Sequence, residues 1–114
     1  MIKKFIFPDD ENGQVLRQMS QDGDDLSKPR EVTFNVVFKD EISANKFSGD
    51  IHYRGCHIKI TKSNVVPERP WDVAVIFNMI PSHSEISAIE KDLGSMASKY
   101  DGINDGWGCF SQSK

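Results

Sequence analysis

Three side chains that could bind a metal ion cluster near the middle of the chain, where His52, Cys56 and His57 follow one another as H-x-x-x-C-H. A zinc site needs three or four such ligands converging on one point. Cys56 and His57 are consecutive in a predicted β-strand, so their side chains point to opposite faces. The pattern therefore favours a buried thiol and two ordinary surface histidines, and we predict no metal site.

The remaining thiol and the carboxylates give no case for catalysis. A nucleophilic cysteine needs a base and an electropositive setting, but Cys109 has no histidine close to it in the sequence and acidic residues lie nearby. The acidic run around Asp22, Asp24 and Asp25 lacks the alternating ligands and terminal glutamate of an EF-hand calcium loop. Solvated charge at a helix end is the simpler interpretation. We therefore predict no catalytic residue, no cofactor and no enzymatic activity.

The stretch YDGINDGWGCF, residues 100–110, places three glycines around one tryptophan. A phosphate-binding glycine loop follows a strand and opens a helix, whereas here a predicted helix ends and a strand follows. Gly102 is predicted to end that helix, and Asp105-Gly106 suits a tight turn. Gly106 and Gly108 remove side chains on either side of Trp107, as happens where a strand packs closely or bulges. Turns and close packing thus account for the three glycines, but they do not explain why a tryptophan stands between Gly106 and Gly108.

Hydrophobic periodicity predicts the elements that position these residues. Alternation is clearest over 30–38, where Val32, Phe34, Val36 and Phe38 share one face. Ser82 and Glu85 have the spacing of a capping box at the start of a helix. An initial helix followed by βαββαβ predicts an α+β, ferredoxin-like sandwich with a four-stranded antiparallel sheet and an extra N-terminal helix. The expected helices span 8–21, 40–53 and 82–100, and the expected strands span 30–38, 56–61, 71–80 and 105–111.

Length and charge predict a single domain over residues 1–114, with short flexible ends at 1–8 and 111–114. The net charge of −3 argues against direct nucleic-acid binding, which needs a basic face, and no apolar run is long enough to span a membrane. Two cysteines do not make a disulfide framework, which favours a cytoplasmic protein with reduced thiols. In a ferredoxin-like sheet Cys56 and Cys109 would lie about 14 Å apart, beyond the disulfide limit of about 7 Å.

Several segments together resemble the regulator of ribonuclease activity B family, the ribonuclease E inhibitor proteins. The matching pieces are Asp22-Gly23-Asp24 after the first helix, the alternating strand that follows, Tyr100-Asp101, and Asp105-Gly106-Trp107-Gly108. The order of elements also matches from about residue 10 to residue 110. The resemblance implies a ferredoxin-like fold without enzymatic activity. It further implies a protein that binds the endoribonuclease ribonuclease E and so modulates RNA decay.

The leading hypothesis is therefore a non-enzymatic inhibitor that contacts a ribonuclease as a monomer or weak dimer. The candidate contact residues are Asp22, Asp24, Asp25, Asp105 and Trp107. For Trp107 core packing is the alternative, and for the aspartates it is solubility. A second hypothesis is a small-molecule-binding regulatory domain with its ligand at a dimer interface. A third, an acylphosphatase-type hydrolase, lacks the expected arginine in a phosphate-cradling loop.

Overall fold

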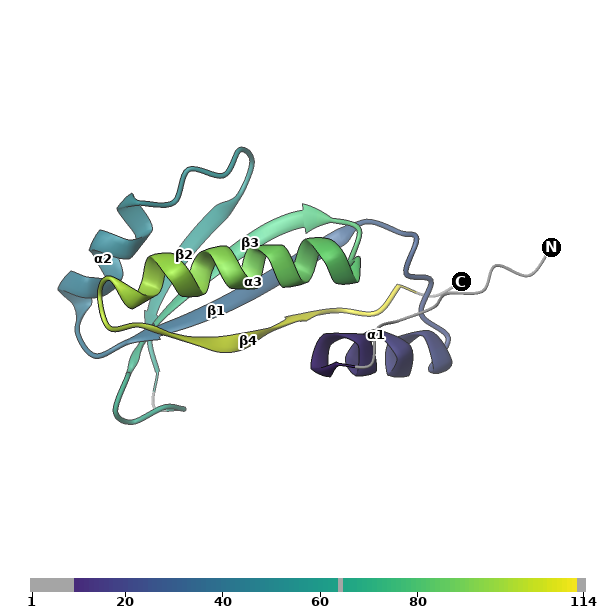
Figure 1. Cartoon of the computed structure of the whole chain (residues 1–114), viewed down its shortest axis with the longest axis horizontal. Coiled ribbons are helices and arrows are strands. Elements are labelled where there is room, and N and C mark those ends of the chain that lie inside the picture. The colour runs from purple at the N-terminus through teal and green to yellow at the C-terminus, as the bar shows by residue number, and fades with distance from the viewer. Residues whose placement is uncertain (1–9, 64, 113–114) are drawn as a thin grey trace.

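The computed structural model describes residues 10–63 and 65–112, which form helices and strands in the predicted order (Figure 1). Along the chain the elements are α1 (Glu11–Gln21), β1 (Arg30–Phe38), α2 (Glu41–Gly49), β2 (His57–Lys62), β3 (Trp71–Met79), α3 (His83–Ser98) and β4 (Ile103–Cys109). The α+β class is confirmed. The predicted flexible segment 1–8 and residues 113–114 lie outside the described part of the chain.

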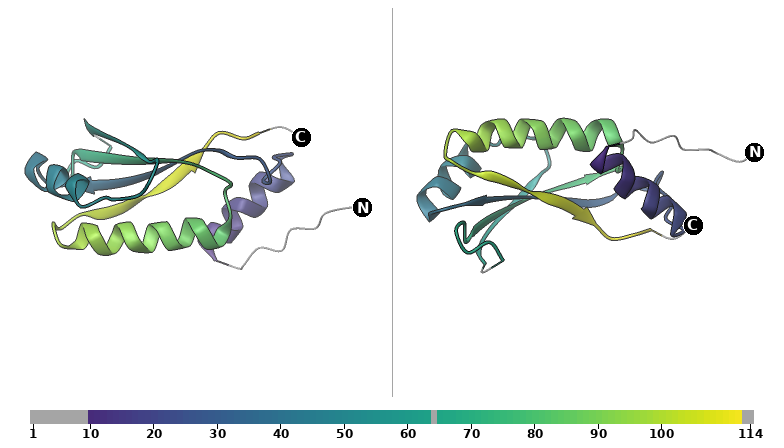
Figure 2. Two further views of the ribbon diagram at one scale, coloured as in Figure 1. Left: turned by 90° about the horizontal axis from the view of Figure 1, so that it is seen from above. Right: turned by 60° about the horizontal axis from the view of Figure 1, so that its bottom comes forward.

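The four strands form one antiparallel sheet in the order β2-β3-β1-β4. In this sheet Phe34 of β1 faces Val75 of β3 on one side and Trp107 of β4 on the other. Figure 2 shows α3 lying along one face of the sheet, with α2 at one end and α1 at the other. This is the ferredoxin-like arrangement with an added N-terminal helix.

The core lies between the sheet and the helices. In β1 the predicted alternation is confirmed, because Val32, Phe34, Val36 and Phe38 are all buried. The helices contribute buried residues spaced three, four or seven positions apart, as one apolar face requires. These are Leu16 of α1, Ala44 and Phe47 of α2, and Ile86, Leu93 and Ala97 of α3. The shared core therefore fixes how α2 and α3 lie against the sheet and where α1 attaches.

Each helix begins at a side-chain cap, which satisfies a backbone N–H that would otherwise have no partner. The contacts are Asp10 Oδ1 with Gly13 N–H at 2.8 Å, Asp40 Oδ1 with Ser43 N–H at 2.7 Å, and Ser82 Oγ with Glu85 N–H at 3.3 Å. The cap predicted at Ser82 is thus present. In α1 the cap is Asp10, so the helix begins at Glu11 and not at residue 8 as predicted.

Helix α2 is shorter than predicted, because it ends at Gly49 and not near residue 53. Asp50 caps its end, and the chain then turns so that Ile51 packs into the core with 8% of its surface exposed. Gly55, at φ +77°, allows a further turn into β2. Phe47 and Ile51 have the i, i+4 spacing of a helix although only Phe47 is helical. The prediction, which relied on this periodicity, therefore extended α2 about four residues beyond its end at Gly49.

Strand β4 begins at Ile103, before the predicted start at Asp105, and contains a β-bulge. Phe34 faces Trp107 while Val36 faces Asn104, so Asp105 and Gly106 together oppose one residue of β1. Gly106 has a φ of +97°, which favours glycine. The predicted tight turn at Asp105-Gly106 is therefore wrong. Of the two alternatives given for the glycines beside Trp107, close packing or a bulge, the bulge is present.

Gly102 has a different role from the helix stop that the sequence predicted. Asp101, at φ +57°, takes the left-handed conformation after α3, and Gly102 N–H donates to the Ala97 carbonyl at 2.9 Å. A Cβ on Gly102 would lie 2.3 Å from Cε1 of Phe38. Glycine is therefore required here because the chain passes directly against a buried aromatic ring.

Candidate partner-binding surface

Helix α1 is attached to β4 and α3 through the side chain of Asn12. Its amide nitrogen donates to Glu90 Oε1 at 2.7 Å and to Ser87 Oγ at 3.2 Å, and its oxygen accepts from the indole N–H of Trp107 at 2.9 Å. One turn further along, Leu16 is 1% exposed in the core. The buried side chain of Leu16 and the amide of Asn12, which bonds three residues, therefore fix the orientation of α1.

A second polar contact joins the starts of α1 and α3. The ring nitrogen His83 Nε2 lies 2.9 and 2.8 Å from the two carboxylate oxygens of Asp10. The hydrogen bond from Gly13 N–H, and then the bond from His83, lower the pKa of Asp10 below its usual range. The carboxylate that caps α1 thus also ties this helix to α3.

Trp107 is half-buried at this junction, and its side chain packs partly against the core. A groove of about 320 Å³ opens beside it between α1, α3 and β4. We call it the Trp107 groove, and its lining residues are Glu11, Asn12, Val15, Glu90, Asn104, Gly106 and Trp107. Trp107 therefore combines core packing with partial exposure at a surface hollow.

The Trp107 groove is acidic. Glu11 is exposed and Glu90 is half-buried in its wall, and the exposed Asp105 lies between two lining residues in the bulge of β4. No lysine or arginine is among the residues that line it. Carboxylates beside an indole suit a lysine or arginine side chain, which can form ion pairs and, over the ring, a cation–π contact.

Asp24 does not belong to an exposed acidic loop, which corrects the sequence-based expectation. Its Oδ2 accepts from Arg30 Nη1 at 2.7 Å, and these side chains are 1% and 2% exposed. Burial acts to lower the pKa of Arg30, but the hydrogen bond and charge of Asp24, with a smaller contribution from Cys109, outweigh it and raise that pKa. Asp24 is therefore committed to a buried ion pair and is not available to a partner.

The same ion pair fastens the segment after β4 to the loop after α1. Arg30 Nη1 also donates to the Phe110 carbonyl at 3.2 Å, and the Gln112 N–H donates to Asp24 Oδ1 at 3.1 Å. Asp25 N–H in turn donates to the Gln112 carbonyl at 2.8 Å. Residues 111–112 were predicted as part of a flexible end. Both backbone groups of Gln112, its N–H and its carbonyl, are instead hydrogen-bonded to the loop after α1.

The structure separates the other candidate residues into two places. Asp22 is exposed just after α1, and Asp25 is half-buried, accepting from Ser27 Oγ at 2.6 Å. Trp107 meets α1 at Asn12, ten positions before Asp22, which at about 1.5 Å per residue is about 15 Å along the helix. Asp105 and Trp107 thus lie at the Trp107 groove, whereas Asp22 and Asp25 lie at the opposite end of α1.

Sequence reasoning missed Asn12, Glu11 and Glu90. Asn12 carried a usable signal, because it stands four positions before Leu16 and so shares the buried face of α1. A polar residue on an apolar face needs hydrogen-bond partners. Glu90 carried no such signal, since its role depends on the placement of α1 beside α3.

The described residues contain few features of a catalytic centre. Burial raises the pKa of the Cys109 thiol, against the opposing charge of Arg30, so this thiol is less reactive than a free cysteine. Within residues 10–63 and 65–112 no group of three or more His, Cys, Asp or Glu side chains could hold a metal ion. None of the helices in this part of the chain is long and apolar enough to cross a membrane.

Comparison with known protein families identifies a match over most of the chain. The family model described as "Regulator of ribonuclease activity B" matches residues 9–109, which include all four strands and the three helices described above. The matched range covers the Trp107 groove and the Asp24–Arg30 ion pair. No curated protein matches the chain.

Proposed function

The chain belongs to the regulator of ribonuclease activity B family, and we propose that it binds ribonuclease E as a non-enzymatic inhibitor in the cytoplasm. The family's name implies regulation of ribonuclease activity. The observation that carries the proposal is the Trp107 groove, where a half-buried tryptophan lies between carboxylates on the surface. Tryptophan is among the residues that contribute most binding energy at protein interfaces.

The contact we propose is with a basic segment of the nuclease. Glu11, Asp105 and the lining residue Glu90 supply negative charge around the groove, and Asp22 and Asp25 extend it beyond the end of α1. Opposite charges steer two proteins together and set the orientation of docking, and salt screens this attraction. The net charge of −3 is mild. We therefore expect binding that weakens clearly as ionic strength rises.

The test measures binding to purified ribonuclease E and its cleavage of a model RNA at increasing concentrations of this protein. We expect saturable binding, and inhibition that follows occupancy. The double charge reversal Glu11→Lys with Asp105→Lys should weaken binding about ten-fold, because it places cations at the groove. Circular dichroism checks that the variant keeps its fold, so that weaker binding can be attributed to the groove.

The matched control is Glu41→Lys with Glu68→Lys, which changes the net charge equally at exposed sites. Glu41 also stands in the first turn of its helix, as Glu11 does, so the effect on the helix dipole is similar. The control should bind like the wild type. Equal weakening by both doubles would show a general charge effect and refute the groove as the contact. Absence of any binding or inhibition would refute the function itself.

A further inference from the structure

A second hollow lies on the other side of α3 from the Trp107 groove. It has a volume of about 330 Å³ and opens between the segment after α2 and the C-terminal half of α3. Its lining residues are Asp50, His52, Tyr53, Asp92, Ser95 and Met96. The three from α3 are spaced at i, i+3 and i+4, so they share one helical face. Ligand pockets commonly begin at about 300 Å³, so this space suits a small molecule.

Two tyrosines hold the carboxylates of this hollow in place. Tyr53 Oη donates to Asp92 Oδ2 at 3.1 Å, and Tyr100 Oη donates to Asp50 Oδ2 at 2.5 Å. Tyr53 is itself anchored in the core, with its ring 5.2 Å from that of Phe77 in an edge-to-face contact. A phenol has one proton to donate, so each carboxylate keeps further acceptor positions.

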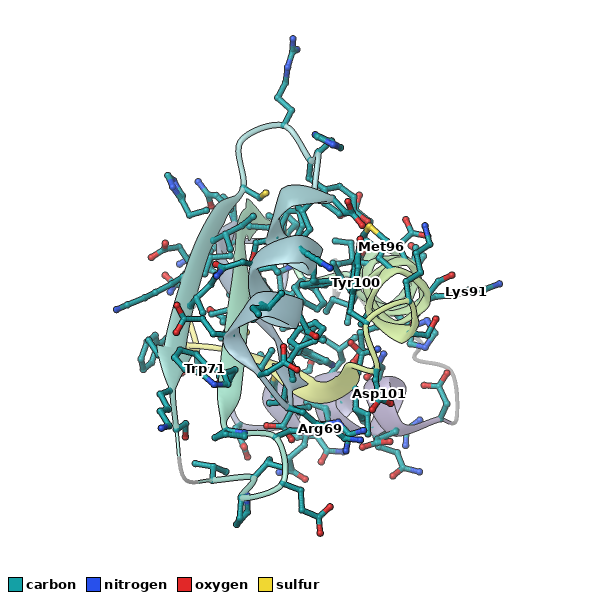
Figure 3. All side chains as sticks on the ribbon, turned by 90° about the vertical axis from the view of Figure 1, so that its left-hand side faces the viewer. Arg69, Trp71, Lys91, Met96, Tyr100 and Asp101 are labelled. Atoms are coloured by element: carbon teal, nitrogen blue, oxygen red, sulfur yellow. The ribbon has the colours of Figure 1, made fainter. Side chains whose placement is uncertain are left out.

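The two carboxylates give this hollow a negative charge that no ion pair neutralises within the described part of the chain. Among the described residues no lysine or arginine forms an ion pair with Asp50 or Asp92. In Figure 3, Met96 and Tyr100 lie on the side of α3 that faces α2, whereas Lys91 points away from it. Burial, and then the bond to Asp92, raise the pKa of Tyr53 to about 12. The phenol therefore stays a proton donor throughout the physiological range.

We propose that this hollow binds a small organic cation, an aliphatic amine or a guanidinium compound. The carboxylates of Asp50 and Asp92 pair with the cationic groups. The Tyr53 ring and the Met96 side chain contact the aliphatic part, and an aromatic face adds a cation–π attraction. The lining holds one histidine and two carboxylates, but they do not converge as a metal-ligand set. This proposal does not depend on binding to a ribonuclease.

The experiment titrates the ¹⁵N-labelled full chain with butane-1,4-diamine, spermidine, Mg²⁺ and a short arginine-containing peptide separately, and follows amide chemical shifts. For at least one amine we expect saturable shifts confined to residues 50–53 and 92–96. Asp50→Asn with Asp92→Asn should weaken that binding at least about ten-fold. Asp92→Asn alone, at an exposed position, should weaken it measurably and keeps an acceptor for Tyr53.

The matched control is Asp22→Asn with Asp105→Asn, which removes the same charge at exposed sites elsewhere and should leave amine binding unchanged. Three outcomes would overturn the proposal. One is equal weakening by the two doubles, which would mean general electrostatic attraction. Another is binding of Mg²⁺ at the same residues as tightly as the amines. The third is binding only of an arginine-containing peptide, with no response to free amines, which would identify a protein-contact surface instead.

Discussion

At the scale of single residues, the contact between Gly102 and Phe38 leaves no room for a side chain. Phe38 is 0% exposed, and its ring lies 5.0 Å from that of Phe47, so it cannot move aside without disturbing the core. A methyl group 2.3 Å from Cε1 must therefore displace the chain. We expect Gly102→Ala to lower the free energy of unfolding by about 1–3 kcal/mol, measured by urea denaturation.

Gly108→Ala is the control for that substitution, because a Cβ there meets nothing within 4 Å. Its free energy of unfolding should stay within about 0.5 kcal/mol of the wild type. If the alanine at residue 102 were tolerated equally well, the close approach to Phe38 would not constrain this position.

Asp22 and Asp24 stand two positions apart and give opposite predictions. Asp24→Asn leaves the guanidinium of Arg30 buried without its charged partner, so we expect the free energy of unfolding to fall by about 3 kcal/mol. Asp22→Asn removes the same charge from an exposed side chain and should change it by less than about 0.5 kcal/mol. Similar unfolding curves for the two variants would contradict a structural role for Asp24.

At the scale of elements, local signals located all four strands and the starts of α2 and α3 to within about two residues, but placed the start of α1 three residues too early. Alternation located β1 over residues 30–38 because one face of that strand is buried throughout, whereas the other is exposed or half-buried except at Val37. The signals failed where tertiary contacts decide the path. Ile51 continues the helical spacing of α2 but packs from a turn. The bulge in β4 depends on the pairing of Asn104 and Trp107 with β1, which periodicity within β4 does not encode.

The docking of α1 should depend on pH through its cap, Asp10. The pKa of Asp10 lies below its ordinary value of 3.8 in the folded protein, so the ionised carboxylate favours folding. This contribution is fully present above about pH 4 and is lost as the pH falls through the lowered pKa. Asp10→Asn should therefore lower Tm at pH values above about 4, and the difference from the wild type should shrink as the pH falls further.

Asp40→Asn provides the comparison, because Asp40 caps α2 in the same way but bonds no histidine within the described part of the chain. Asparagine is itself a good N-cap, so both variants keep the capping hydrogen bond. We expect the loss in Tm to be larger for Asp10→Asn, since only Asp10 also contacts His83. A larger loss for Asp40→Asn would show that the contact with His83 does not stabilise the docking of α1.

At the scale of the whole molecule, the fold was predictable and the site only in part. The resemblance and the element order agreed because both depend on the arrangement of strands and helices. The buried role of Asp24 depends on Arg30 together with backbone groups 86 to 88 positions away, at Phe110 and Gln112. Nothing local in Asp22-Gly23-Asp24-Asp25 distinguishes the buried carboxylate from its exposed neighbour. Likewise, Trp107 was found as a candidate, but its groove exists only because α1 packs beside β4.

The sheet order also determines the behaviour of the two thiols. Cys56 lies just before β2 and Cys109 ends β4, at opposite edges of the sheet, and both are free. Three strand spacings separate those edges by about 14 Å, which exceeds the reach of a disulfide, about 7 Å. We therefore expect diamide treatment of the native protein to yield no intramolecular disulfide.

Thiol titration after denaturation should find two thiols per monomer, with any loss accounted for by dimers on a non-reducing gel. Val32→Cys is the positive control, because Val32 faces Cys109 across neighbouring strands. A wild-type monomer lacking both thiols would mean that the two edges meet, which the antiparallel order β2-β3-β1-β4 forbids.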